Sequence, residues 1–185
     1  MVTRVLPWVI TVVLLVGAWF VAQATPTGDE AQARAFMVGA SVGEPAEGRN
    51  IAVTVQDARI AHAIASEDGF RAEGTWVVID LDAEAVRRQY GTSLAAKLRI
   101  GDATYKSTER GKTSWLIDRT QLVTGIPKSG SLAFQIPADL LTETAVLELT
   151  DSSFSAYDSI ISLELDLPEL TVVNEKAIAP VDWTP

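Results

Sequence analysis

The sequence predicts an all-β domain, an antiparallel β-sandwich, preceded by one apolar N-terminal helix. Two observations predict the sandwich. Apolar and polar residues alternate with a period of two in segments that recur roughly every ten residues, and turns containing Gly or Pro separate these segments. In addition, no amphipathic helix pattern of ordinary length follows the N-terminal segment. We expect the sandwich over residues 36–170, after a polar linker at 25–35 and before a less regular C-terminal tail at 171–185.

The first half of the predicted sandwich contains two well-marked strands. Asn50–Val55 alternates cleanly, and the apolar positions then change parity around Gln56–Ala58, which predicts a β-bulge with one extra residue there. Thr75–Leu81 is apolar on both faces, as strands in the centre of a sheet are. Ala83–Gln89 has the Ala and Glu content typical of a helix, but it lacks a cap and a strong apolar stripe, so we expect the strand to continue to about Arg87.

The second half continues the same pattern. Gly101-Asp102 is predicted to be the turn of a β-hairpin, because it lies between two short strand-like segments. One helical turn is expected at Ala138–Leu141. The segments expected to form strands here are Lys97–Ile100, Ala103–Lys106, Leu132–Ile136, Leu147–Leu149 and Ile161–Leu167.

The segment Val5–Ala24 is apolar and carries no charge. A helix of this length spans roughly 30 Å, the thickness of a bilayer's hydrocarbon core. Arg4 precedes it and acidic residues follow, so the positive-inside rule predicts a cytoplasmic N-terminus and an extracytoplasmic domain. Two interpretations remain open: a retained single-pass anchor in the cell membrane, or a signal peptide. Ala22-Gln23-Ala24 provides a cleavage site from which the protein would be secreted.

Composition excludes several classes of protein. The 185 residues include no cysteine, so there is no disulfide frame, no thiolate site and no lipid-anchored lipoprotein. The net charge of −9 and the pI near 4.6 disfavour nucleic acid as a partner, because an acidic domain repels a phosphate backbone.

Several of these segments together carry a resemblance to a known family. They are Val42–Glu44 with Ile51–Val55, Thr75–Leu81, Leu98–Ser107 and Gly130–Pro137. Over roughly Val38–Leu167 the chain resembles a bacterial family of immunoglobulin-like extracellular domains of unknown function, whose relatives include small secreted immunoprotective antigens. The resemblance implies an immunoglobulin-like sandwich, tethered to or secreted from the cell, and it supplies no catalytic or cofactor-binding residues.

Motifs for catalysis and metal binding are weak, so we expect neither an enzyme nor a cofactor or metal site. Gly39–Gly43 matches the G-x-S-x-G pattern of serine hydrolases, but Glu44-Pro45 disfavours the helix that the motif requires. His62 is the only histidine. Asp80, Asp82 and Glu84 share one face of a strand and could bind calcium, but we expect a solvated sheet face, since calcium ligands usually come from a turning loop. A hydrolase that uses acidic residues alone is the remaining catalytic possibility, with no particular residue indicated.

Positive charge is concentrated in one stretch of this acidic chain. Residues 87–112 have a net charge of +5. Because the whole chain has a net charge of −9, the other residues together have a net charge of −14. The basic residues are Arg87, Arg88, Lys97, Arg99, Lys106, Arg110 and Lys112. They could protect exposed strand edges from aggregation, or they could form a docking face for an anionic envelope component or an acidic partner protein.

From the sequence, the first functional hypothesis is a membrane-anchored, non-catalytic module at the cell surface that binds or supports an envelope component or a partner protein. The alternative is a secreted antigen-like or inhibitor-like protein, released by cleavage after Ala24.

Overall fold

The computed structural model of the chain describes residues 10–19, 21, 36–87, 91–110, 116–152 and 158–184. The chain forms two units, residues 1–34 and 35–185. In the first, residues 10–19 and 21 are helical, within the apolar segment predicted to be a helix. Of the described helical residues, none belongs to a helix long and apolar enough to cross a membrane. The rest of Val5–Ala24, its cleavage site and the linker at 25–35 lie outside the described residues.

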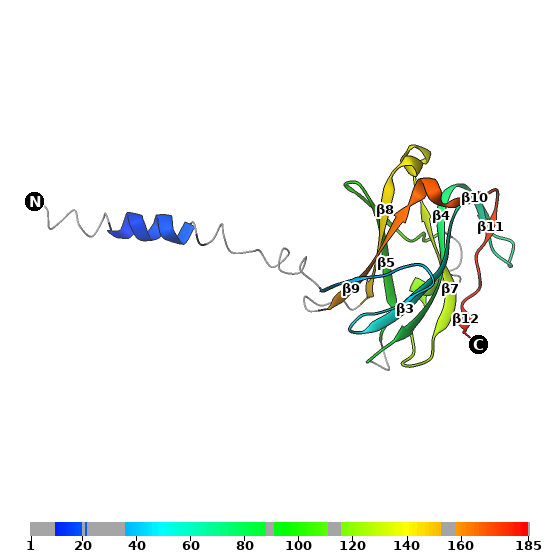
Figure 1. The fold of residues 1–185 in the computed structure, drawn as a ribbon, viewed down its shortest axis with the longest axis horizontal. Coiled ribbons are helices and arrows are strands. Elements are labelled where there is room, and N and C mark those ends of the chain that lie inside the picture. Colours follow the sequence, from blue (N-terminus) through cyan, green and yellow to red (C-terminus); the bar gives the residue numbers. More distant parts are fainter. Residues whose placement is uncertain are drawn as a thin grey trace, which may run out of the picture. The chain divides into compact units, whose positions relative to one another are not determined.

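The second unit is a β-sandwich of two sheets, as predicted (Figure 1). The first sheet has the strand order β1 (Phe36–Gly39), β9 (Ser159–Asp166), β8 (Thr144–Asp151), β5 (Leu94–Ile100) and β6 (Ala103–Lys106). The second has the order β10 (Thr171–Val173), β3 (Ile51–Ala65), β4 (Arg71–Ala85), β7 (Lys128–Gln135) and β12 (Asp182–Trp183). Two further short strands, β2 (Pro45–Glu47) and β11 (Lys176–Ala177), pair with β3.

The order of the main strands is immunoglobulin-like. If β3 to β9 are lettered A, B, C, C′, E, F and G along the chain, one sheet reads A-B-E and the other G-F-C-C′. This is the arrangement of immunoglobulin sandwiches, in which the chain passes repeatedly between the two sheets. The immunoglobulin-like prediction is therefore confirmed for the fold. The pairs between these main strands are antiparallel, whereas β1, β10 and β11 add to the sheet edges in parallel.

The main core lies between the sheets and is built from the alternation seen in the sequence. Val77, Ile79 and Leu81 of β4 are almost fully buried, and they belong to the same apolar cluster as Leu98 of β5 and Leu147 of β8. Because alternate residues of a strand point to opposite faces, this parity places Val77, Ile79 and Leu81 together toward the first sheet. Burial of this cluster, without any disulfide, holds the two sheets together.

The predicted β-bulge is present at Gln56. In the pairing of β3 with β4, Val55 lies opposite Leu81 and Asp57 lies opposite Asp80, so Gln56 is the extra residue. The bulge shifts the inward face by one residue, which brings Ile60 as well as Val55 into the core. A second register shift lies beside His62, between Ala61 and Ala63, and the sequence pattern did not predict it.

Other local predictions also hold, with differences in length. The strand at Ala83 continues only to Ala85, but it is a strand and not a helix. Gly101 adopts a φ of 55° in the β5–β6 hairpin, a backbone conformation that glycine tolerates best. The expected helical turn is a 3₁₀ helix, η3 (Ala138–Thr142). The sequence analysis expected short strands, whereas β3 and β4 each have 15 residues, because their bulges allow one hairpin to continue past each parity change.

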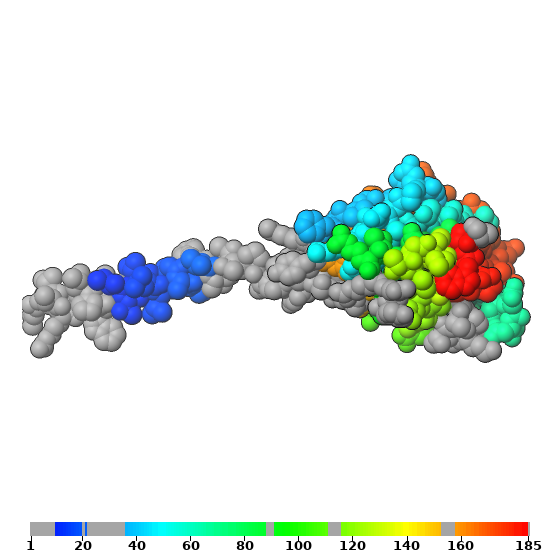
Figure 2. Space-filling model, turned by 90° about the horizontal axis from the view of Figure 1, so that it is seen from below, coloured from blue at the N-terminus to red at the C-terminus, as the bar shows by residue number. Residues whose placement is uncertain are grey.

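The C-terminal residues cover the outer face of the second sheet. Trp76 and Ala133 on that face pack with Ile64 and with Ile178 of the tail in a second apolar cluster, and Ile178 is only 3% exposed. This explains why β4 is apolar on both faces: it is central, as predicted, and the tail shields its outer side. The tail is also more regular than its sequence indicates, because it contributes β11 and β12. Figure 2 shows its red surface against the yellow-green surface of β7.

Two acidic residues of β4 hold this tail in place. Asp80 Oδ2 lies 2.6 Å from Lys176 Nζ, and Asp80 Oδ1 accepts a hydrogen bond from Ser131 Oγ at 2.5 Å. Asp82 Oδ1 accepts hydrogen bonds from Ser129 Oγ and, at 3.3 Å, from Thr184 Oγ1. The expected solvated face is therefore occupied at Asp80 and Asp82 by interactions within the protein. The sequence analysis missed these because the partners lie far along the chain.

If the tail is part of the folded unit, then Ile178→Ala lowers the free energy of unfolding by about 2–5 kcal/mol, since a buried branched side chain is lost and leaves a cavity. The measurement is urea denaturation followed by fluorescence. The matched control is Val172→Ala in the same tail, because Val172 is 54% exposed and its loss changes stability by no more than about 0.5 kcal/mol. Equal effects of the two substitutions would contradict the packing of the tail.

Candidate functional site

The structure brings together only part of the predicted basic set. Lys97 and Arg99 project from β5, and Lys106 from the neighbouring β6, at exposed positions. Arg87 is exposed just after β4 of the other sheet, and Arg110 Nη1 donates a 3.5 Å hydrogen bond to Gln135 on β7. The other two predicted residues, Arg88 and Lys112, lie outside the described residues.

Lys97 and Lys106 form a pair of like charges directly across from one another. Side chains at such positions have Cβ atoms only about 4.5–5.5 Å apart, and like charges there are destabilising. Among the described residues neither lysine has an ion-pair partner, whereas their neighbour Arg99 lies 3.3 Å from Glu148 on β8. This face therefore has two adjacent positive charges, and Lys97 also lies directly across from Glu148 of β8, which is paired with Arg99.

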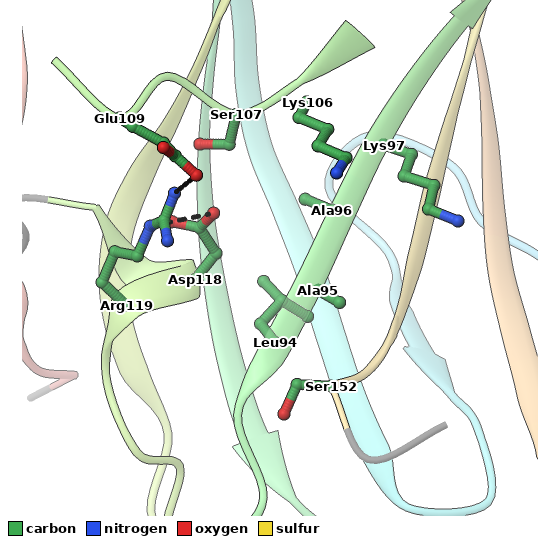
Figure 3. A pocket seen from close by; sticks show the side chains of 10 residues that line it. All are labelled: Leu94, Ala95, Ala96, Lys97, Lys106, Ser107, Glu109, Asp118, Arg119 and Ser152. Atoms are coloured by element: carbon green, nitrogen blue, oxygen red, sulfur yellow. Dashed lines mark hydrogen bonds and ion pairs between the residues drawn. The ribbon is translucent and has the colours of Figure 1, made fainter. Parts of the chain in front are cut away.

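A hollow of about 310 Å³ lies beside this lysine pair (Figure 3). It forms because the chain after β6 leaves the first sheet: Thr108 N donates a 2.8 Å hydrogen bond to Ala133 O of β7. The chain returns only where Gln121 pairs with Ser93. Between these points, Leu94–Ala96 of β5 has no neighbouring strand on that side within the described part of the chain.

The hollow contains charges of both signs at its end away from the lysines. Arg119, at the end of η2 (Ile117–Arg119), lies 3.5 Å from Glu109 and 3.8 Å from Asp118. Figure 3 shows these three side chains at one end of the hollow, and Lys97 and Lys106 at the other. Arg119 is thus compensated by acidic neighbours, and the lysines are the cations available to a ligand.

Two polar groups at the back of the hollow are buried and lack hydrogen-bond partners. The Asp118 side chain is only 10% exposed. Its Oδ1 atom and the Oγ atom of Ser107 are buried and have no hydrogen-bond partner among the described residues. Burial raises the pKa of the Asp118 carboxyl above its usual value, although the nearby Arg119 and Ser107 oppose that rise. Unsatisfied buried polar atoms are uncommon, and in a hollow they are available to a ligand.

Sequence reasoning missed Ser107, Asp118 and Arg119. They lie in irregular segments on either side of residues 111–115, so no strand or helix periodicity marks them, and nothing in their spacing relates them to Lys97. The only signal that the sequence offered was the surrounding positive charge, which indicated the β5–β6 hairpin but not the hollow.

The residues considered for catalysis do not form a catalytic group. Ser41 is exposed in a turn in which Glu44 N donates a 3.2 Å hydrogen bond to Ser41 O. The strand β2 follows that turn, in place of the helix of a nucleophile elbow. His62 is exposed on β3. Among the described residues, no cluster of three or more acidic or histidine side chains could hold a metal ion.

Comparison with known proteins shows little beyond the fold. No family model matches the sequence, and no curated protein matches it significantly. An uncharacterised β-sandwich protein from Clostridium difficile is 11% identical with a TM-score of 0.45, and the match covers 69% of this chain and 95% of that one. A candidate lipoprotein from Bacillus subtilis is 12% identical with a TM-score of 0.47, and the match covers 70% of this chain and 40% of that one. Similarity this low says nothing about function, and the resemblance to immunoprotective antigens stays a prediction.

The environment of Asp118 predicts a pH-dependent gain in stability on its neutralisation. Because the folded-state pKa is raised, the folded protein binds this proton more tightly than the unfolded chain, and stability falls as pH rises through the folded-state value. Asp118→Asn is therefore expected to be more stable than wild type at pH 7, with an advantage that disappears below about pH 4. Thermal unfolding across this range is the measurement.

The Asp118→Asn substitution leaves the other charged residues that line this hollow in place: Arg119, Glu109, Lys97 and Lys106. Asp139→Asn, at an exposed carboxylate, is the control and is expected to show little change. An Asp118→Asn protein that is less stable than wild type at pH 7 would contradict the burial argument.

Reversing one charge of the lysine pair should stabilise the fold. Lys106→Glu replaces repulsion across β5 and β6 with attraction, and the expected gain is roughly 0.2–1 kcal/mol in the free energy of unfolding. Arg87→Glu makes the same change in net charge away from the pair and controls for general effects of charge. A loss of stability in Lys106→Glu, measured by urea denaturation at low salt, would show that the two lysines do not repel each other.

Proposed function

We propose that the chain is a non-catalytic, extracytoplasmic β-sandwich module that binds an anionic component of the cell envelope through Lys97 and Lys106. The observation that supports this most directly is the position of Lys97. Protection of a sheet edge accounts for Lys106, because β6 is the last strand of its sheet. It accounts less directly for Lys97, because Lys97 is paired with Lys106 on one side and Glu148 on the other, and the strand edge is open only at the preceding Leu94–Ala96.

The surrounding charges support the same proposal. Five other basic side chains, those of Arg59, Arg71, Arg99, Arg119 and Lys176, each lie within 4 Å of a carboxylate. In a protein with a net charge of −9, many carboxylates are available to pair with cations. A lysine pair without such partners, at the mouth of a hollow, is the arrangement expected of a surface that receives an anion from outside. The acidic remainder of the molecule would repel anions, and so direct binding to this face.

The proposed location depends on the sequence of Val5–Ala24. Its length, its lack of charge and the preceding Arg4 favour a single-pass anchor with a cytoplasmic N-terminus. The alternative keeps the same binding face on a secreted antigen-like or inhibitor-like protein, because Ala22-Gln23-Ala24 fits signal cleavage.

The binding experiment uses residues 35–185, which contain every described strand and both apolar clusters. Sedimentation with isolated bacterial envelopes, with phosphatidylglycerol vesicles and with phosphatidylcholine vesicles measures the bound fraction. We expect binding to envelopes that weakens as salt rises from about 50 to 500 mM, because exposed charges are screened. Binding to the anionic vesicles as well would identify lipid headgroups as the target; binding to envelopes alone would identify another anionic component.

In that assay Lys97→Glu and Lys106→Glu should each reduce binding several-fold, and Arg87→Glu should have little effect. Equal loss in all three variants would indicate a response to net charge alone and would reject the proposed face. A bound fraction that changes neither with salt nor with these substitutions would reject the proposal of an anionic target.

The location is tested with the full chain carrying a C-terminal tag in whole bacterial cells. External protease should remove the tag, and a carbonate wash should leave the protein in the membrane pellet at its full intact mass. A mature chain that begins at Thr25 and is found in the medium would support the secreted alternative. A tag protected from protease would contradict both locations.

A further inference from the structure

We infer that the hollow beside β5 is a binding site for one small hydroxylated anion. Lys97 and Lys106 would hold its phosphate or carboxylate group, and a neighbouring hydroxyl of the same ligand would donate a hydrogen bond to Asp118. This inference deepens the proposed function, because it uses the same lysine pair, and it specifies the unit of the anionic component that the module recognises. The proposal rests on the composition of the hollow at its two ends and on its size.

The lysine end suits an anionic group. The two side chains start from directly opposed positions on β5 and β6, so both ammonium groups can reach one anion. An anion placed between them removes the repulsion that the unliganded protein carries. Each contact is also a charge-assisted hydrogen bond, which is stronger than a bond between neutral groups.

The opposite end suits a hydrogen-bond donor, not a second anion. Asp118 and Glu109 both line the hollow, and their carboxylates would repel a dianion that extended along it. Asp118 Oδ1 and Ser107 Oγ are the two buried atoms lining the hollow that lack a hydrogen-bond partner in the described part of the chain, and a carboxylate can only accept hydrogen bonds. A hydroxyl group on the ligand supplies the donor that Asp118 lacks. Ser107 can then donate to the ligand or to the carboxylate.

The size of the hollow limits the ligand to a single unit. Its volume of about 310 Å³ lies at the lower end of the range for small-molecule sites, roughly 300–1,000 Å³. Leu94, Ala95 and Ala96 form one wall, where the strand edge has no neighbour among the described residues and its backbone groups can bond a ligand. Leu94 and Ala96 face the core, and the half-buried Ala95 can contact the carbon skeleton of a sugar or a polyol. A sugar acid or a polyol phosphate combines these properties.

The test measures binding of four probes to residues 35–185 by amide NMR: glucuronate, glycerol 3-phosphate, inorganic phosphate and glucose. We expect both hydroxylated anions to shift the amide signals of Ala95, Ala96, Ser107 and Asp118. They should bind about tenfold more tightly than inorganic phosphate, the gain expected from one hydrogen bond to a charged group. Glucose, without the charge, should bind at least tenfold more weakly than glucuronate.

Two variants separate the two ends of the site. Lys97→Gln should weaken all three anions about tenfold. Asp118→Asn should remove the preference for glycerol 3-phosphate over inorganic phosphate and leave phosphate affinity unchanged or improved, since a negative charge is lost. Arg87→Gln is the matched control. It should change neither the affinity for the three anions nor the preference for glycerol 3-phosphate over inorganic phosphate. A preference that survives in Asp118→Asn, or shifts confined to residues away from the hollow, would overturn the inference.

The outcomes also separate this inference from the proposed function. If Lys97→Glu abolishes envelope binding but no small anion binds in the hollow, the inference fails and the proposed function stands. If the hydroxylated anions bind as described but the domain does not bind to envelopes, the small-anion site stands and the envelope target is rejected.

Discussion

The structure depends on the burial of β4 on both of its faces. Its inward residues pack against the first sheet, and its outward Trp76 would be exposed without the C-terminal tail. The tail therefore completes the sandwich: Ile178 fills the outer apolar cluster, and the interaction of Lys176 with Asp80 fixes the segment across the sheet. In a chain without cysteine, this two-sided burial takes the place of the disulfide that often joins the sheets of immunoglobulin domains. Pairing with β4 holds β7 in position. The chain that follows β6 then crosses to β7, where the Thr108 amide bonds the Ala133 carbonyl.

The candidate site arises from an interruption in this otherwise continuous pairing. After Lys106 the chain crosses to β7, because the Thr108 amide bonds Ala133, and three residues of β5 are left without a neighbour in the described part of the chain. The interruption leaves Ser107 and Asp118 at one end of the hollow and Lys97 with Lys106 at the other. Both the lysine repulsion and the burial of Asp118 cost stability in the free protein. Such costs are frequent at binding sites, where a ligand relieves them.

Much of the fold could be predicted because its signals are local. Alternation at Ile51–Val55, the parity change at Gln56 and the glycine turn at Gly101 each depend on a few adjacent residues, and all three agree with the structure. The role of the tail could not be predicted, since Asp80 and Lys176 are far apart in sequence and each alone resembles a solvated charge. The site was predicted only in part for the same reason. Clustered basic residues indicated the β5–β6 hairpin, but Asp118 and Arg119 come from an irregular segment, and the fold alone brings them to the lysines.

The placement of the tail also has a consequence for biosynthesis. Ile178 follows β3, β4 and β7 in the chain, and yet it completes the apolar cluster on the outer face of the sheet that these strands form. A nascent chain can pair β3 with β4 soon after both emerge, but Trp76 lacks its contact with the tail until Ile178 has emerged as well. The outer apolar cluster consequently stays incomplete while the preceding strands are synthesised, and an incompletely folded chain can be threaded through a narrow translocation channel.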